Sequence, residues 1–181
     1  MTARPLLVIT TACAAAAVAM TSAAAQRPVG AAASCTHQSL AQFPHAFSSA
    51  DNLVVGPFVL VGGGRLTTAD TVRRFGGNKF PALVAAGHRV TVELTHRTRR
   101  FASLGYGPLP QNRELGTADG HRVVTFRSCD RRKAGSDASG RPVTFWSGFV
   151  LASEPQCVRL RVWVDAEREP HTVKLPLGHR C

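Results

Sequence analysis

The sequence lacks the compact motifs that mark most secreted hydrolases and zinc proteins. It contains no H-E-x-x-H segment, with which zinc proteases place two histidines on one helix face. Ser147 stands in F-W-S-G-F, which lacks the first glycine of the G-x-S-x-G elbow of α/β-hydrolases. No two cysteines have the C-x-x-C spacing of a structural zinc site. We therefore predict no metal or cofactor site, and any catalytic site would have to be assembled from dispersed residues.

Lysine, tyrosine and acidic residues are also scarce. The only lysines are Lys79, Lys133 and Lys174, so arginine carries most of the positive charge. The chain has 11 acidic residues against 22 Lys and Arg, a formal net charge of +11 that favours anionic polymers or membranes as partners. The single Tyr and the two Trp are not interleaved with basic groups as base-stacking platforms are, so nucleic acid is not expected as a partner.

Residues 1–25 have the pattern of a secretory signal peptide. Arg4 precedes an uncharged, mostly apolar run over 6–20, and Ala23 and Ala25 frame a cleavage site. The run is shorter than the roughly 20 residues that cross a bilayer, which makes an uncleaved anchor the weaker alternative. We predict cleavage after Ala25 and a secreted protein whose mature form has no transmembrane segment.

After the leader, the chain divides into an arm and a β-rich domain. Residues 26–52 are rich in Ala, Ser and Gln without sustained periodicity, and we predict a flexible arm that Cys35 staples to the rest. Residues 53–181 contain short apolar or alternating runs separated by Gly, Pro and charged residues, which is typical of strands. The expected strands are 53–62, 88–95, 101–106, 121–128, 143–152, 157–164 and 171–177.

These runs predict an all-β fold, because no long segment outside the leader repeats at helical spacing. A strand that faces water on one side must bury its other side, and a second sheet is the usual partner. We predict an antiparallel β-sandwich, immunoglobulin-like in a loose sense, with a small β-barrel as the alternative. Residues 66–77 fit one short helix or an irregular connection, and Gly148 predicts a bulge within 143–152.

Short segments of this domain resemble small secreted β-sandwich proteins of actinobacteria that have no assigned function. These segments are G-P-F at 56–58, G-H-R-V-T-V at 87–92, V-T-F-R-S-C at 124–129, F-W-S-G-F at 145–149, C-V at 157–158 and G-H-R-C at 178–181. The resemblance supports the predicted fold and disulfides. It offers no catalytic residue to carry over.

Arginine gathers in short groups, and its planar fork suits phosphate and carboxylate groups. The candidate anion-binding residues are Arg97, Arg99, Arg100, Arg131 and Arg132. Arg73 and Arg74 form a further group. We interpret these groups as contacts to anionic polymers or lipids of the cell envelope, and the alternative interpretation is a surface that only keeps the protein soluble.

Trp163 shares a predicted strand face with Arg159 and Arg161, which leaves two alternatives. Either Trp163 is exposed and stacks on a sugar ring, or a loop or the apolar stems of arginine side chains cover it. The hypothesis for the whole chain is a non-catalytic binding domain of the cell exterior. The competing hypothesis is a secreted hydrolase, which a histidine within reach of a serine or carboxylate inside a cleft would favour.

The last two expected strands, 157–164 and 171–177, predict a hairpin. Matching their inward faces sets Val164 opposite Val173 and Leu160 opposite Leu177. In this register Cys157 falls one residue short of Cys181, and a bulge at Gly178 would bring the two level.

Four cysteines follow the leader, an even number that predicts two disulfides in an exported protein. The hairpin pairs Cys157 with Cys181 and leaves Cys35 for Cys129. The competing arrangement joins Cys129 to a later cysteine across the two sheets. Non-reducing peptide mapping should yield a peptide that links Cys157 to Cys181, and a peptide that links Cys129 to either would contradict the prediction.

Overall fold

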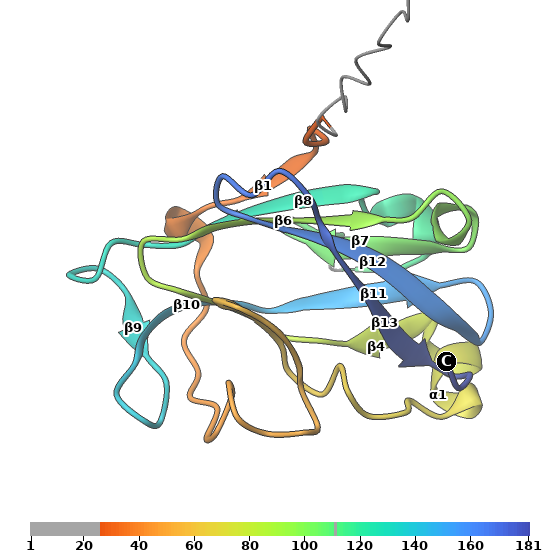
Figure 1. Cartoon of the computed structure of the whole chain (residues 1–181). Helices are drawn as coiled ribbons and strands as arrows, with labels where there is room; N and C mark the ends of the chain where they lie inside the picture. Colours follow the sequence, from red (N-terminus) through yellow and green to blue (C-terminus); the bar gives the residue numbers. More distant parts are fainter. Residues whose placement is uncertain (1–25, 111) are drawn as a thin grey trace, which may run out of the picture.

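The computed structural model describes residues 26–110 and 112–181, so the predicted signal peptide lies outside the described residues. Figure 1 shows strands that form two facing layers, with one short helix, α1 (Ala69–Phe75), at one end. The all-β prediction and its sandwich-like arrangement are confirmed. Residues 66–77, for which a helix or an irregular connection was expected, contain this helix.

One layer is a five-stranded sheet, called sheet A here. Its strands lie in the order β1 (Ala31–Ala33), β8 (Val123–Arg127), β6 (Arg89–Leu94), β12 (Gln156–Val164) and β13 (His171–Leu177). The facing layer consists of two sheets. Sheet B has the order β2 (Leu53–Val55), β3 (Phe58–Leu60), β5 (Ala82–Ala85), β10 (Pro142–Trp146) and β9 (Gly135–Ser136). Sheet C has the order β4 (Gly77–Lys79), β11 (Gly148–Ala152) and β7 (Ala102–Tyr106).

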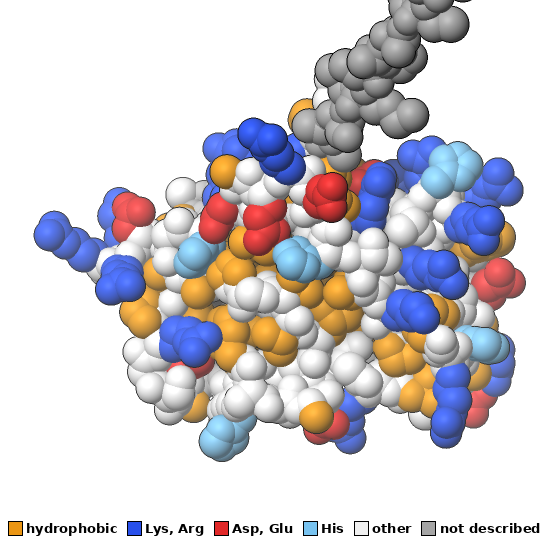
Figure 2. Space-filling model, viewed as in Figure 1, with side chains coloured by type: hydrophobic (Ala, Val, Ile, Leu, Met, Phe, Trp, Pro, Cys, Tyr) orange, Lys and Arg blue, Asp and Glu red, His pale blue; other side chains and the backbone are white. Residues whose placement is uncertain are grey.

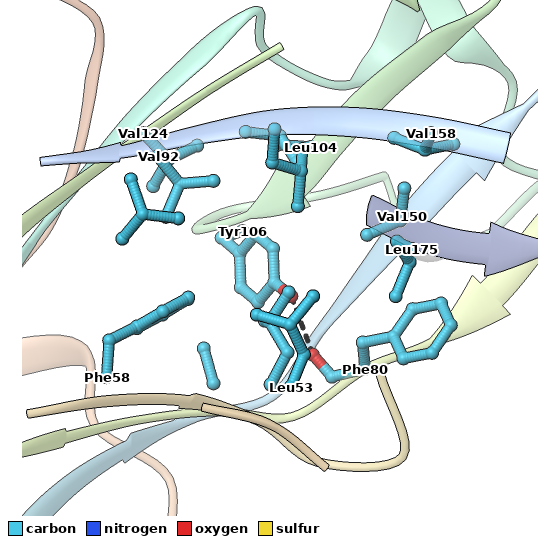
Figure 3. Packing of buried hydrophobic residues seen from close by; sticks show 14 of the residues in the cluster. Leu53, Phe58, Phe80, Val92, Leu104, Tyr106, Val124, Val150, Val158 and Leu175 are labelled. Atoms are coloured by element: carbon cyan, nitrogen blue, oxygen red, sulfur yellow. Dashed lines mark hydrogen bonds between the residues drawn. The ribbon is translucent and has the colours of Figure 1, made fainter. Parts of the chain in front are cut away.

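The core lies between sheet A and the other two sheets, and Figure 3 shows side chains from all three meeting there. The ring of Phe126 in β8 contacts three other aromatic rings, those of Phe58, Tyr106 and Trp146, at centroid distances of 5.6, 5.0 and 5.3 Å. Tyr106 is buried, and its hydroxyl donates a hydrogen bond to the carbonyl of Phe80 at 2.6 Å. Burial raises the pKa of Tyr106, so the hydroxyl stays a proton donor.

The range 143–152, predicted as one strand with a bulge, forms two strands of different sheets. β10 pairs with β5 in sheet B, whereas β11 pairs with β4 and β7 in sheet C. Gly148 begins β11 where the chain changes sheets, and a Cβ atom there would lie 2.2 Å from the Tyr106 ring. The glycine therefore permits the close approach of two strands, and the predicted bulge is a change of sheet.

The segment predicted as a flexible arm is packed into the fold, which differs from the expectation. Ala31 pairs with Val124 in the parallel pairing of β1 with β8, and Ala33 and Ala46 are buried. The disulfide between Cys35 and Cys129 holds the same segment. Small alanine side chains fit against the sheet edge but give no apolar alternation, so the sequence pattern did not indicate a strand.

Both disulfides form as predicted, Cys35 with Cys129 and Cys157 with Cys181. The predicted hairpin register is wrong, because Leu160 lies opposite Val173 rather than Leu177. A shift by an even number of residues keeps the same side chains inward, so the alternation could not decide between these registers.

The turn of this hairpin and the chain beyond it explain the observed register. Asp165 accepts hydrogen bonds from the main-chain N–H of Arg89 at 2.9 Å and from the ring of His88 at 2.7 Å, which ties the turn to β6. Gly178, with φ of 80°, turns the chain after β13. This turn, rather than a bulge within the strand, brings the Cα atom of Cys181 to 5.1 Å from that of Cys157.

The close approach at Gly148 is testable by substitution. We expect Gly148→Ala to lower the free energy of unfolding by about 2 kcal/mol or more, because its methyl group overlaps the Tyr106 ring. Gly135→Ala is the matched control, since the nearest atom to its Cβ lies 3.7 Å away, and its effect should stay within about 0.5 kcal/mol. Urea denaturation measures both, and equal effects would contradict the role assigned to Gly148.

Candidate functional site

Two of the arginine groups meet at one end of the molecule, called the basic end here. The residues that define it are all exposed: Arg73, Arg74, Arg97, Arg99 and Arg100. The first two stand in the last turn of α1, and the others lie at or within the 3-10 helix η2 (Thr98–Arg100). Figure 2 shows Lys and Arg side chains interspersed with hydrophobic ones over this end, where α1 lies.

Sheet C places these groups side by side. Ala102 in β7 pairs with Ala152 in β11, and the N–H of Ala152 donates to the carbonyl of Gly76 at 2.8 Å. η2 precedes β7 and α1 precedes β4. Both strands run antiparallel to β11, so η2 and α1 lie at the same end of the sheet. The backbones that join the two groups to the sheet, at Gly76 and Ala102, thus lie two inter-strand spacings apart, or about 10 Å.

The remaining predicted arginines lie at the opposite end of sheet A. Arg131, Arg132 and Lys133 form an exposed turn after β8, called the distal turn here. β8 ends at Arg127, which pairs with Arg89 at the start of β6, whereas η2 follows the far end of β6. The structure therefore separates Arg131 and Arg132 from the other predicted anion-binding residues, because neighbouring antiparallel strands send their following turns to opposite ends.

The guanidinium groups of the basic end are largely free. In residues 26–110 and 112–181, the side chains of Arg97, Arg99 and Arg100 form no ion pair and no hydrogen bond. Arg73 pairs with Asp70. Elsewhere, Arg113, Arg161 and Arg65 take Asp119, Glu93 and Asp51 as their partners. Glu114 lines a pocket with Arg73 and Arg74, and Glu154 follows Ser153, whose N–H donates to the carbonyl of Phe101, so the five arginines face Asp70 and these two carboxylates.

Two exposed phenylalanines, which the sequence analysis missed, accompany these arginines. Phe75 ends α1 with 64% of its surface exposed, and Phe101 follows η2 with 41% exposed. The guanidinium of Arg74 lies 5.2 Å from the centroid of the Phe75 ring. The signal was present in the sequence, because R-R-F occurs at 73–75 and again at 99–101.

A groove of about 400 Å³ runs beside Phe75. It is lined by Phe149 and Leu151 of β11, by Arg73 and Arg74 of α1, and by Glu114 and Leu115 of a loop. Pockets of this volume hold small molecules. The groove extends the basic end across the outer face of sheet C.

An ion pair shapes the loop that carries Glu114 and Leu115. Arg113 donates to the carboxylate of Asp119 at 2.9 Å, and the N–H of Gly116 donates to it at 2.8 Å. The bond from Arg113, followed by the one from Gly116, holds the pKa of Asp119 below its usual value. The ionised carboxylate therefore orders this side of the groove.

The hydrolase hypothesis finds no assembled site. His88 contacts Asp165 at 2.7 Å, but the Ser128 hydroxyl donates to the main-chain carbonyl of His88, not to its ring. The His37 ring lies 3.1 Å from the Ser34 hydroxyl without a carboxylate beside it. In the part of the chain that the structure describes, no histidine ring contacts both a hydroxyl and a carboxylate, and no three potential ligands gather around a metal position.

Trp163 is buried, with 1% of its surface exposed, so the sugar-stacking alternative is wrong. Arg27 donates to the carbonyl of Glu167 at 3.3 Å, and residues 27–30 line a shallow pocket with Thr125 on the outer face of sheet A. This N-terminal segment crosses the face that Trp163 shares, which the period-two pattern of one strand could not reveal.

Compared with known proteins, the chain matches no family model, no curated protein and no solved structure. The resemblance to secreted actinobacterial proteins stays a prediction, and no site residue can be transferred from a relative. Among the described residues, no helix has the length and apolar character that a membrane crossing requires.

The order of the groove loop should depend on Arg113. We expect Arg113→Gln to raise the pKa of Asp119 toward its ordinary value, because the hydrogen bond that lowers this pKa most is lost. Because the native pKa is lowered, this contribution to stability is present above the unfolded pKa and disappears as the pH falls through the folded pKa. NMR titration of Asp119 measures the shift, with Asp137 as the unaffected control, and an unchanged Asp119 titration would refute the assignment.

Proposed function

We propose that this protein is a non-catalytic, extracytoplasmic binding module that holds anionic components of the cell envelope at its basic end. The observation that carries the proposal is the meeting of two groups of exposed arginines, Arg73 with Arg74 and Arg97 with Arg99 and Arg100, of which the second group forms no ion pair among the described residues. Two disulfides support the compartment, since such bonds persist in oxidising surroundings outside the cytoplasm.

The charge arrangement supports binding rather than mere solubility. A solubilising surface disperses its charge and pairs it with acids, whereas the basic end concentrates cations at one end of sheet C. Guanidinium forks bind phosphate and carboxylate oxygens in pairs of hydrogen bonds. Each arginine near an anionic surface contributes about 1 kcal/mol, and salt screens this attraction.

The test compares two triple variants that remove the same charge. We expect R97Q/R99Q/R100Q to weaken binding to isolated anionic envelope fractions about 100-fold, at about 1 kcal/mol for each charge. R131Q/R132Q/K133Q is the control, because it lowers the net charge equally at the distal turn. Co-sedimentation at increasing salt measures both.

In this comparison the wild-type protein should detach from the fractions at about 1 M salt, where the Debye length is about 3 Å. Equal weakening by the two triple variants would mean that overall charge, not the basic end, drives binding. Retention that survives high salt would also contradict the proposal.

A further inference from the structure

The repeated R-R-F tripeptide is presented twice in the same structural setting. Residues 73–75 end α1 and lead into β4, and residues 99–101 leave η2 and lead into β7. β4 and β7 are the two outer strands of sheet C. Both run antiparallel to β11, so both begin at the same end of the sheet. Two copies of one basic and aromatic element therefore lead into strands whose starts lie about 10 Å apart by strand spacing.

Each copy exposes a large aromatic ring in the midst of positive charge. The exposed fractions of Phe75 and Phe101 are 64% and 41%, whereas Phe58, Phe80 and Phe126 have at most 1% exposed. A soluble polyanion that binds by charge alone leaves such rings in water. A bilayer surface accepts them, because aromatic rings insert at the headgroup boundary while arginines bind the lipid phosphates.

We propose that the anionic partner is a lipid bilayer, and that Phe75 and Phe101 insert into its interface while the neighbouring arginines bind headgroup phosphates. This inference rests on the proposed function and names its partner. Charge complementarity favours this occupant, since the guanidinium of Arg74 lies over the Phe75 ring and the exposed Arg100 directly precedes Phe101. Stable attachment to a membrane needs two signals, and the basic end offers electrostatic attraction together with apolar insertion.

Vesicle flotation tests insertion separately from charge. Wild-type protein should bind vesicles of equal parts phosphatidylglycerol and phosphatidylcholine, and should not bind phosphatidylcholine alone. We expect F75A/F101A to lower partitioning into the vesicles at least about 10-fold, since the variant lacks the two rings that would be buried in the bilayer interface. L40A/V54A is the matched control, because Leu40 and Val54 are exposed apolar residues at 89% and 39% in other parts of the fold. All variants carry the same N-terminus, and thermal unfolding verifies that each is folded.

Single replacements F75W and F101W should keep wild-type binding and report where the ring goes. We expect the fluorescence of each new tryptophan to shift to the blue on anionic vesicles and to be quenched by brominated lipid chains. Trp146 and Trp163 are buried in the fold and supply a constant background.

The possible outcomes distinguish a failure of the proposed membrane insertion from a failure of the proposed function. If F75A/F101A binds anionic vesicles as the wild type does, and the new tryptophans show no shift, the insertion is overturned while binding through arginine stands. Equal capture of wild type and F75A/F101A by soluble polyphosphate, without vesicle binding, would overturn the bilayer as partner. If R97Q/R99Q/R100Q binds every anionic probe as the wild type does, the proposed function itself fails.

Discussion

The close packing of Gly148 against the Tyr106 ring determines where the two arginine-bearing elements of the basic end lie. Because a side chain at this position would overlap the ring, only glycine lets the chain leave sheet B after β10 and enter sheet C as β11. β11 then lies between β4 and β7. The two elements that precede those strands, α1 and η2, therefore lie at the same end of sheet C. The juxtaposition of the arginines is thus a consequence of core packing rather than of a local sequence motif.

The C-terminal strand fixes α1 in this position. Thr67, just before the helix, donates from its N–H to Pro176 at 3.0 Å and accepts from the N–H of Gly178 at 3.0 Å. The disulfide between Cys157 and Cys181 ties the chain beyond Gly178 to β12. Closing that loop stabilises a fold by roughly 3 kcal/mol on the chain-entropy view. A rigidly held helix presents its side chains to a partner without a further ordering cost.

The sequence pattern found the elements in which apolar and polar residues alternate, such as β6, β12 and β13, and it found both disulfides. It missed β1, β4, β5 and β9, because short strands with alanine, glycine, lysine or continuous apolar residues show no period of two. For the site, the arginine groups were visible but their grouping was not. Which of them meet depends on strand order, and the two phenylalanines look like core residues until the fold leaves them exposed.

Hydrogen exchange of the wild-type protein, with and without anionic vesicles, tests the central claim most directly. The account predicts that added protection is confined to the two copies of R-R-F and the residues next to them, at 69–76 and 96–102. The distal turn at 130–134 serves as an internal reference, because it carries similar charge at the opposite end and should exchange at an unchanged rate. Protection at the distal turn, or no protection at either copy of R-R-F, would contradict the account.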